Sequence, residues 1–256
     1  MFIDTHCHLH DEKLIFNTDR IVEEYLRDGV EIAINAGVNL DSSTEGKMLA
    51  EKYPSVYFMA GYHPSDSDSF SEKEFDKILS LTSHKKCLAV GEIGLDYYWK
   101  PFDREKQIRV FTSQIDLANS CSLPISIHCR DATLDTLSIL KQNKGKLKNG
   151  AVMHCYSGSV ETAKELLDLG VYISFAGPLT FKNAKNTVEV AKYLPNDMCL
   201  TETDSPYLAP HPLRGRVNEP KNVSLITAFL AEIKNLELQE MAKIIMANAK
   251  RLFKKL

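Results

Sequence analysis

The stretch FIDTHCH, residues 2–8, opens on apolar and β-branched residues and closes on two histidines separated by one position. A short apolar run of this kind predicts a buried strand, here over Phe2–His6. Similar runs, rich in Val, Ile, Phe and Tyr, return along the rest of the chain, so the sequence predicts eight strands. The other seven are Glu31–Val38, Val56–Tyr62, Cys87–Ile93, Pro124–Cys129, Ala151–Cys155, Val171–Phe175 and Met198–Thr203.

Amphipathic, helix-like segments separate these runs. Arg20–Asp28 and Asp103–Ser120 carry apolar residues three to four positions apart, and the chain from Val223 to Leu256 also has a helical pattern. Strands that alternate with helices imply a parallel sheet with crossover helices. Eight such units in 256 residues fit a closed barrel. We therefore predict an α/β fold, a (β/α)₈ TIM barrel with a single domain over residues 1–256. A doubly wound sheet is the alternative, but no GxGxxG turn follows the first strand.

Composition narrows the class of protein only slightly. The formal net charge is −3, with 44% hydrophobic and 25% charged residues, which is ordinary for a globular protein and unlike a protein that coats nucleic acid non-specifically. Six cysteines without a CxxC pair indicate buried thiols in a reducing compartment. The sequence has no signal-peptide pattern and no apolar run as long as a membrane span. We expect a cytoplasmic protein, monomeric and without membrane contact.

The two histidines that end the first strand are the first chemical signal. Side chains alternate along a strand, so His6 and His8 face one side and Cys7 faces the other. Two imidazoles on one face can bind one metal ion, although an HxH pair alone is weak evidence for a metal site. The alternative interpretation is that the strand simply ends in polar residues that bind no metal.

Other strand ends carry matching residues, and these strengthen the signal. Glu92 lies near the end of the fourth predicted strand, and His128, His154 and Asp204 end the fifth, sixth and eighth. A parallel barrel brings the carboxyl ends of its strands together at one mouth, where the active sites of this fold are built. The sequence therefore predicts one metal site formed by His6, His8, Glu92, His128, His154 and Asp204.

The ligand types also indicate a chemistry. Because a carboxylate can bridge two ions and Glu92 is central in strand order, we expect a binuclear centre. Two divalent ions form a clamp for displacement at a phosphoryl or acyl centre, and each lowers the pKa of a bound water. Asp204, beside that water, is the expected general base. The sequence thus predicts a hydrolase with Glu92 and Asp204 as its catalytic carboxylates.

Further residues at the mouth are candidates for substrate binding. For His63, after the third strand, we expect either a contact with substrate or ligands, or a capping role. Arg130 suits a phosphate oxygen, unless it is a surface residue beside a helix cap at Asp131. Arg214 and Arg216, in a loop after the eighth strand, either hold a polyanion or are simply solvated.

Three cysteines, Cys7, Cys129 and Cys155, each follow a predicted ligand histidine. Alternation turns their side chains toward the layer between barrel and helices, so we expect packing rather than metal ligation. Glu202 shares a face with Asp204 but lies deeper, which favours a buried partner. The remaining histidines are expected to be solvated: His10, His84 and His211.

At these residues the sequence resembles the TatD family of metal-dependent deoxyribonucleases, within the amidohydrolase-like barrels. The matching blocks are DTHCH (4–8), GYHP (61–64), GEIGLD (91–96), IHCRDA (127–132), HCYSGS (154–159), ETDSPYL (202–208) and Arg214 to Pro220. They follow the family's order over nearly the whole chain. Tyr156 and Ser205 depart from the commoner phenylalanine and alanine, and neither is a ligand position.

The resemblance implies hydrolysis of DNA phosphodiester bonds, often exonucleolytic, by a metal-activated water at a binuclear centre. It implies that His6, His8 and Asp204 hold one ion, that a second set of ligands holds the other, and that Glu92 bridges them. That second set is His128 and His154. The ions are divalent: the family is usually described as Mg²⁺-dependent, whereas four imidazoles suit Mn²⁺ or Zn²⁺ better.

Two other functions are compatible with the same residues. One is a different hydrolase, such as an amidase or an esterase acting on aminoacyl-tRNA, which the choice of substrate would distinguish. The other is a barrel retained only for binding. A descendant without activity is expected to lose ligands, and all six are present.

Overall fold

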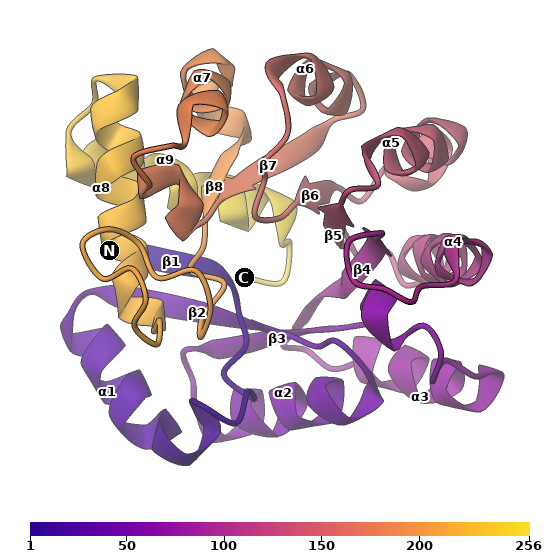
Figure 1. Ribbon diagram of the computed structural model, residues 1–256. Helices are drawn as coiled ribbons and strands as arrows, with labels where there is room; N and C mark the ends of the chain where they lie inside the picture. Colours follow the sequence, from indigo (N-terminus) through magenta and orange to yellow (C-terminus); the bar gives the residue numbers. More distant parts are fainter.

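The computed structural model describes the backbone of residues 1–256 and all side chains other than that of Glu72. Within this described part, eight strands form one sheet in the order β1 to β8, and each neighbouring pair is parallel (Figure 1). All eight predicted strands are present, and the expected TIM barrel is confirmed. The strands are β1 (Phe2–Cys7), β2 (Val30–Ala36), β3 (Val56–Ala60), β4 (Cys87–Asp96), β5 (Ile125–Arg130), β6 (Ala151–Met153), β7 (Val171–Phe175) and β8 (Cys199–Thr201).

Helices surround the sheet and cover its outer face (Figure 1). The predicted helices Arg20–Asp28 and Asp103–Ser120 correspond to α1 and α4, and the predicted helical tail is divided into α8 and α9. The helices are α1 (Thr18–Arg27), α2 (Leu40–Lys52), α3 (Glu72–Thr82), α4 (Arg104–Ser120), α5 (Thr133–Gln142), α6 (Val160–Asp168), α7 (Lys185–Tyr193), α8 (Val223–Lys234) and α9 (Leu238–Leu252). None of the described helices is long and apolar enough to cross a bilayer.

The ends of the sheet are joined by hydrogen bonds just beyond β8. The Asp204 amide donates to the His6 carbonyl over 2.9 Å, and the His8 amide donates to the Ser205 carbonyl over 2.7 Å. Deeper in the barrel, the buried Asp4 carboxylate accepts from the Thr203 amide over 2.8 Å. The contact between the first and last strands therefore fixes the backbone of predicted site residues.

A close approach between β4 and β5 requires glycine at position 94. Gly94 has a φ of +148°, and a Cβ there would lie 2.0 Å from the His128 carbonyl oxygen. Any side chain at this point would separate the two strands. The glycine in the GEIGLD block thus brings β4 against β5.

Candidate metal centre

Glu92 lies at the middle of the cluster at the mouth of the barrel. It is buried on β4, and its two carboxylate oxygens face different groups. Oε2 lies 3.2 Å from His6 Nε2 and 3.7 Å from His8 Nε2. Oε1 lies 2.7 Å from His128 Nδ1 and 2.8 Å from His154 Nε2. One carboxylate therefore separates two pairs of imidazoles.

Asp204 joins the pair from β1. Its Oδ1 lies 3.3 Å from His8 Nε2 and 3.9 Å from His6 Nε2. The residue is three positions beyond the end of β8 at Thr201 and has a φ of +55°, a left-handed conformation that favours Gly, Asn and Asp. The structure thus brings all six predicted ligands together. We call His6, His8 and Asp204 the β1 side of Glu92, and His128 and His154 the β5 side.

The second ring nitrogen of each histidine on the β1 side faces a neutral group. His8 Nδ1 lies 3.0 Å from the Ala36 carbonyl oxygen, and His6 Nδ1 lies 3.5 Å from the Ser126 hydroxyl. Such partners behind a ligand fix the orientation of the ring and its tautomer. In both rings Nε2 is left to face Glu92.

On the β5 side the partners behind the ligands are carboxylates. His128 Nε2 lies 3.1 Å from Asp96 Oδ2, and His154 Nδ1 lies 3.3 Å from Glu202 Oε1. Glu202 is the buried partner expected from the sequence, and it also accepts from the Cys155 amide over 2.6 Å. Sequence reasoning assigned no role to Asp96. Its position four residues after Glu92 on one strand, hence on the same face, is the signal that could have found it.

The charges of the cluster are strongly coupled. Burial raises the pKa of Glu92, but the charge of His154 and the hydrogen bond from His128 outweigh it and hold that pKa well below its ordinary value. Burial lowers the pKa of His154, but Glu92 and Glu202 raise it well above the usual range. The buried carboxylates thus need cationic partners, which protons supply here and metal ions can supply instead.

The donor atoms fit a divalent metal. Donor atoms of His6, His8 and Glu92 lie within 4.8 Å of one another, as do those of His63, Glu92 and His128. The buried His6 Nε2 lies 3.2 Å from Glu92 Oε2 but forms no hydrogen bond of good geometry with any described residue, so it is available as a metal ligand. Imidazole with carboxylate suits Zn²⁺, Mn²⁺ and related ions.

His63 differs from these four histidines in the role of its Nδ1. That nitrogen accepts a hydrogen bond from the Ser65 amide over 3.1 Å, which caps the turn Pro64–Asp66. Burial, together with the charge of His128, lowers the pKa of His63 to about 3, so the ring is neutral and its proton is on Nε2. Nε2 lies 3.6 Å from Glu92 Oε1. His63 therefore both caps a turn and presents an N–H to the cluster.

The predicted arginines lie at the rim and are exposed. The Arg130 guanidinium stacks on the ring of Tyr98, 3.8 Å from its centroid. Arg214 stacks on Phe181 at 4.5 Å, and Arg216 is exposed on the same loop. The structure places none of the three in the cluster itself.

Some expectations for the neighbouring residues are corrected. Cys7 is buried and donates to the Ile34 carbonyl, and the half-buried Cys129 packs against the core beside a cavity lined by residues of α5 and α6, so packing is confirmed for both. Cys155 is half-buried and lines the same cavity. His10 is not solvated, because its Nδ1 lies 3.2 Å from Asn35 Oδ1 and its ring packs against His8. Of the other two histidines, His84 is half-buried and His211 is exposed as expected.

A parallel barrel with a buried histidine and carboxylate cluster at the carboxyl ends of its strands defines the class of metal-dependent hydrolases. Comparison with known proteins gives the particular family. The model of the family described as TatD related DNase matches residues 3–254. The chain belongs to the TatD family.

Individual relatives agree with this assignment. The uncharacterized metal-dependent hydrolase YabD of Bacillus subtilis is 42% identical over 254 residues, which are 99% of each chain. YcfH of Escherichia coli K12, also described as an uncharacterized metal-dependent hydrolase, is 35% identical over 98% of this chain and 95% of its own. The crystal structure of YJJV, a TatD homologue from Escherichia coli K12, superposes with a TM-score of 0.93 at 28% identity, covering 99% of this chain and 98% of that one.

Proposed function

We propose that this protein is a deoxyribonuclease that hydrolyses DNA phosphodiester bonds exonucleolytically at a binuclear metal centre. The observation that carries the proposal is the division of Glu92, whose two oxygens face two separate sets of ligands. A carboxylate placed in this way bridges two ions. Two-ion centres stabilise both the attacking and the leaving oxygen of an in-line displacement.

Each side of Glu92 would hold one divalent ion, Mg²⁺, Mn²⁺ or Zn²⁺. The β1 side offers His6, His8 and Asp204, and the β5 side offers His128 and His154. When bound, the ions would supply Lewis acidity and would lower the pKa of a water molecule.

The chain's own residues perform the remaining steps. The Asp204 carboxylate lies at the edge of the β1 side and takes the proton from the attacking water. Burial raises the pKa of Asp204, but the hydrogen bond from His8 and the charges of His154 and His8 outweigh it and lower that pKa. The carboxylate is therefore charged and can accept a proton. The N–H of His63 and the guanidinium of Arg130 orient the phosphoryl oxygens, and Arg214 and Arg216 attract the strand beyond them.

The choice of DNA as substrate rests on membership of the TatD family, whose model is described by DNase activity. Arginines at the rim suit a polyanion, although the chain as a whole has a net charge of −3. We further propose that the enzyme acts as a monomer in the cytoplasm, in line with its six free cysteines.

A nuclease assay tests the proposal directly. Purified protein is reconstituted with Mg²⁺, Mn²⁺ or Zn²⁺ and given single- and double-stranded DNA labelled at either end, with EDTA as the metal-free control. We expect stepwise shortening from one end that EDTA abolishes. If DNA stays intact with every ion while a carboxylic ester, an amide or an aminoacyl-tRNA is cleaved, the protein is a different hydrolase of the same class.

A further inference from the structure

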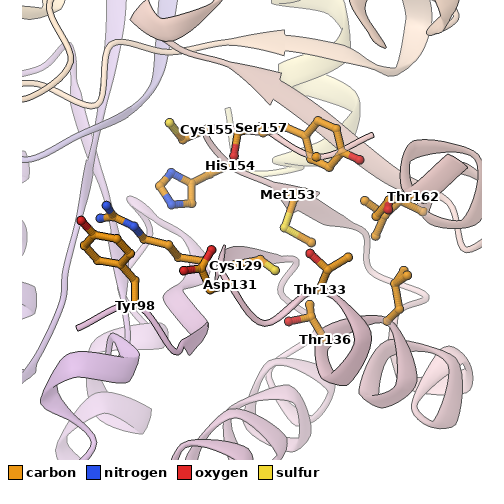
Figure 2. Close-up of a pocket in the computed structure, with 15 residues that line it drawn as sticks. Tyr98, Cys129, Asp131, Thr133, Thr136, Met153, His154, Cys155, Ser157 and Thr162 are labelled. Atoms are coloured by element: carbon orange, nitrogen blue, oxygen red, sulfur yellow. The ribbon is translucent and has the colours of Figure 1, made fainter. Parts of the chain in front are cut away.

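A cavity of about 400 Å³ lies beside the β5 side of the metal centre (Figure 2). It is formed by the ends of β5 and β6, the segments that follow them, one residue after β4, and residues of α5 and α6. His154 is part of both the cavity and the metal centre, because its side chain lines the cavity and its Nε2 lies 2.8 Å from Glu92 Oε1. A group bound in this cavity is therefore adjacent to whatever occupies the metal centre.

The lining combines an apolar surface with several hydroxyl groups. Figure 2 shows Thr133 and Thr136 on one side of the cavity and Cys155 and Ser157 on the other. Met153, Leu137 and Leu166 supply apolar surface. The lining is thus more polar than apolar, and the volume lies within the range of about 300 to 1,000 Å³ that is typical of ligand sites.

One of these polar groups has only a weak partner. Thr136 is 1% exposed, and its Oγ1 forms no hydrogen bond of good geometry with any described residue. Its neighbour is the Cys129 thiol, a weak hydrogen-bonding group. A buried hydroxyl with so weak a partner costs free energy, and a ligand that hydrogen-bonds to it would reduce that cost.

The rim of the cavity carries a positive charge. Arg130 lines it, and the guanidinium carbon lies 3.8 Å from the centroid of the ring of Tyr98, which lines it as well. Guanidinium planes and aromatic rings are surfaces on which heterocyclic bases stack. The ligand that fits all three observations is flat, has hydrogen-bonding edges and is joined to a phosphate.

We propose that this cavity binds the nucleobase of the nucleotide whose phosphate lies at the metal centre. The proposal rests on the proposed function, because it takes the phosphoryl group at the metals to be part of a nucleotide. The base edge reaches the Thr136 hydroxyl, and the base stacks beside Arg130. Thr136 is thereby a specificity-determining residue, and it acts on substrate binding without touching the reacting atoms.

Binding of nucleotide fragments tests the cavity without relying on turnover. Calorimetry on the metal-loaded protein compares 2′-deoxynucleoside 5′-monophosphates with 2-deoxyribose 5-phosphate, which lacks the base. We expect the base to increase affinity by at least about tenfold. Thr136→Val keeps the shape of the side chain and removes the hydroxyl, and is expected to weaken nucleotide binding by about five- to tenfold while deoxyribose phosphate binds as before.

A second pair of variants keeps the test informative if Thr136→Val does not fold. Thr133 is exposed at the rim, so Thr133→Phe fills the opening without disturbing the core. Its control is Leu134→Phe, since Leu134 is 84% exposed and is not part of the lining. We expect Thr133→Phe to remove the advantage of the base, and Leu134→Phe to leave it unchanged.

Failure of this proposal differs from failure of the proposed function. If the base adds no affinity, or if Thr133→Phe leaves its contribution intact, the cavity is not a base site, even when the enzyme cleaves DNA. If nucleotides bind with the expected dependence on Thr136 but DNA is never cleaved, the base site stands and the nuclease proposal falls. Equal rates on DNA ends with and without the terminal base would also overturn the base site.

Discussion

The two sides of Glu92 both place negative charge near their histidines, but they do so with different groups. On the β1 side the negative charge is directly among the ligands, because Asp204 Oδ1 lies 3.3 Å from His8 Nε2. The groups behind the two histidines there are neutral, a carbonyl at Ala36 and a hydroxyl at Ser126. The carboxylate of Asp204 can therefore balance part of the charge of a divalent ion on the β1 side, without charged groups behind the histidines.

On the β5 side the negative charge stands behind the ligands. Asp96 lies 3.1 Å from His128 Nε2, and Glu202 lies 3.3 Å from His154 Nδ1. A carboxylate in this position makes an imidazole more basic and a better ligand, but it does not touch the ion. His128 is also the more open ligand, with 16% of its side chain exposed, against 1% for His6.

This difference indicates that the two sides differ in how tightly they bind an ion and in how close they lie to the substrate. A direct carboxylate binds an ion more tightly than one acting through an imidazole, so we expect the β1 side to retain its ion and the β5 side to exchange it. The β5 side also adjoins the cavity and Arg130, which places it toward the substrate. Five substitutions test how far the two sides are independent.

The largest effect is expected from Glu92→Gln, because this residue serves both sides. The amide keeps the size of the side chain but cannot bridge two cations. We expect a loss of activity of about 10⁴-fold, the upper end for a single catalytic group, and a loss of bound metal from both sides. Nuclease assays and elemental analysis of the metal-loaded protein measure the two effects.

The matched control for Glu92→Gln is Glu237→Gln, at an exposed position before α9. It removes one carboxylate elsewhere and should leave both readouts unchanged. Full metal content in Glu92→Gln would show that the two sides bind ions without a bridge.

Asp204→Asn should affect the β1 side alone. Asparagine tolerates the positive φ of this position as aspartate does, so the loop keeps its conformation and only the charge is lost. We expect activity to fall by about 10³-fold, within the range for a general base, and metal to be lost from the β1 side. The β5 side should still bind its ion, which metal titration followed by calorimetry would detect as one remaining class of site.

The fold and the group of residues at the mouth of the barrel were accessible from sequence for one physical reason. Apolar runs alternating with amphipathic segments have few architectures available, and a parallel barrel gathers its strand ends at one mouth. Residue type at those ends, as in His6 and His128, then suffices to indicate a metal site. No knowledge of side-chain geometry is needed for that step.

Contacts between segments that lie far apart in the chain could not be predicted from the sequence. Strands β6 and β8 have only three residues each, so His154 and Asp204 lie beyond them. Their positions are fixed by hydrogen bonds to other strands, from the His154 amide to the Ile127 carbonyl and from the Asp204 amide to the His6 carbonyl. Such bonds join residues far apart in the chain, and no local pattern encodes them.

The cavity beside His154 was missed for a related reason. The alternation rule is correct for Cys129, which packs against the core, but it does not extend to Cys155, which has a φ of +43° just past β6. The rule holds only within a regular strand. Asp96 could have been placed on the face of Glu92 by its spacing along one strand, but its contact with His128 joins two strands and could not be predicted.

A smaller effect, confined to the β5 side, is expected from the carboxylates behind its ligands. Asp96→Asn and Glu202→Gln retain shape and remove charge, and each should weaken metal affinity on that side by about 10- to 100-fold. The β1 side should be unaffected. Competition with a metal-binding dye measures the affinity of each side, and equal weakening of both sides by either variant would contradict the difference between the two sides.

The smallest effect is expected from Ser126→Ala, the corresponding change behind a ligand on the β1 side. The hydroxyl lies 3.5 Å from His6 Nδ1, at the limit of a hydrogen bond, and a neutral bond of this kind contributes about 1 kcal/mol or less. Metal affinity on the β1 side should therefore fall by less than about fivefold, measured by the same dye competition. Because Asp204 supplies the charge there directly, losing a neutral partner leaves the ion's main ligands in place. If Ser126→Ala weakened binding as much as Asp96→Asn, the groups behind the ligands would matter equally on both sides, and the asymmetry would not govern metal retention.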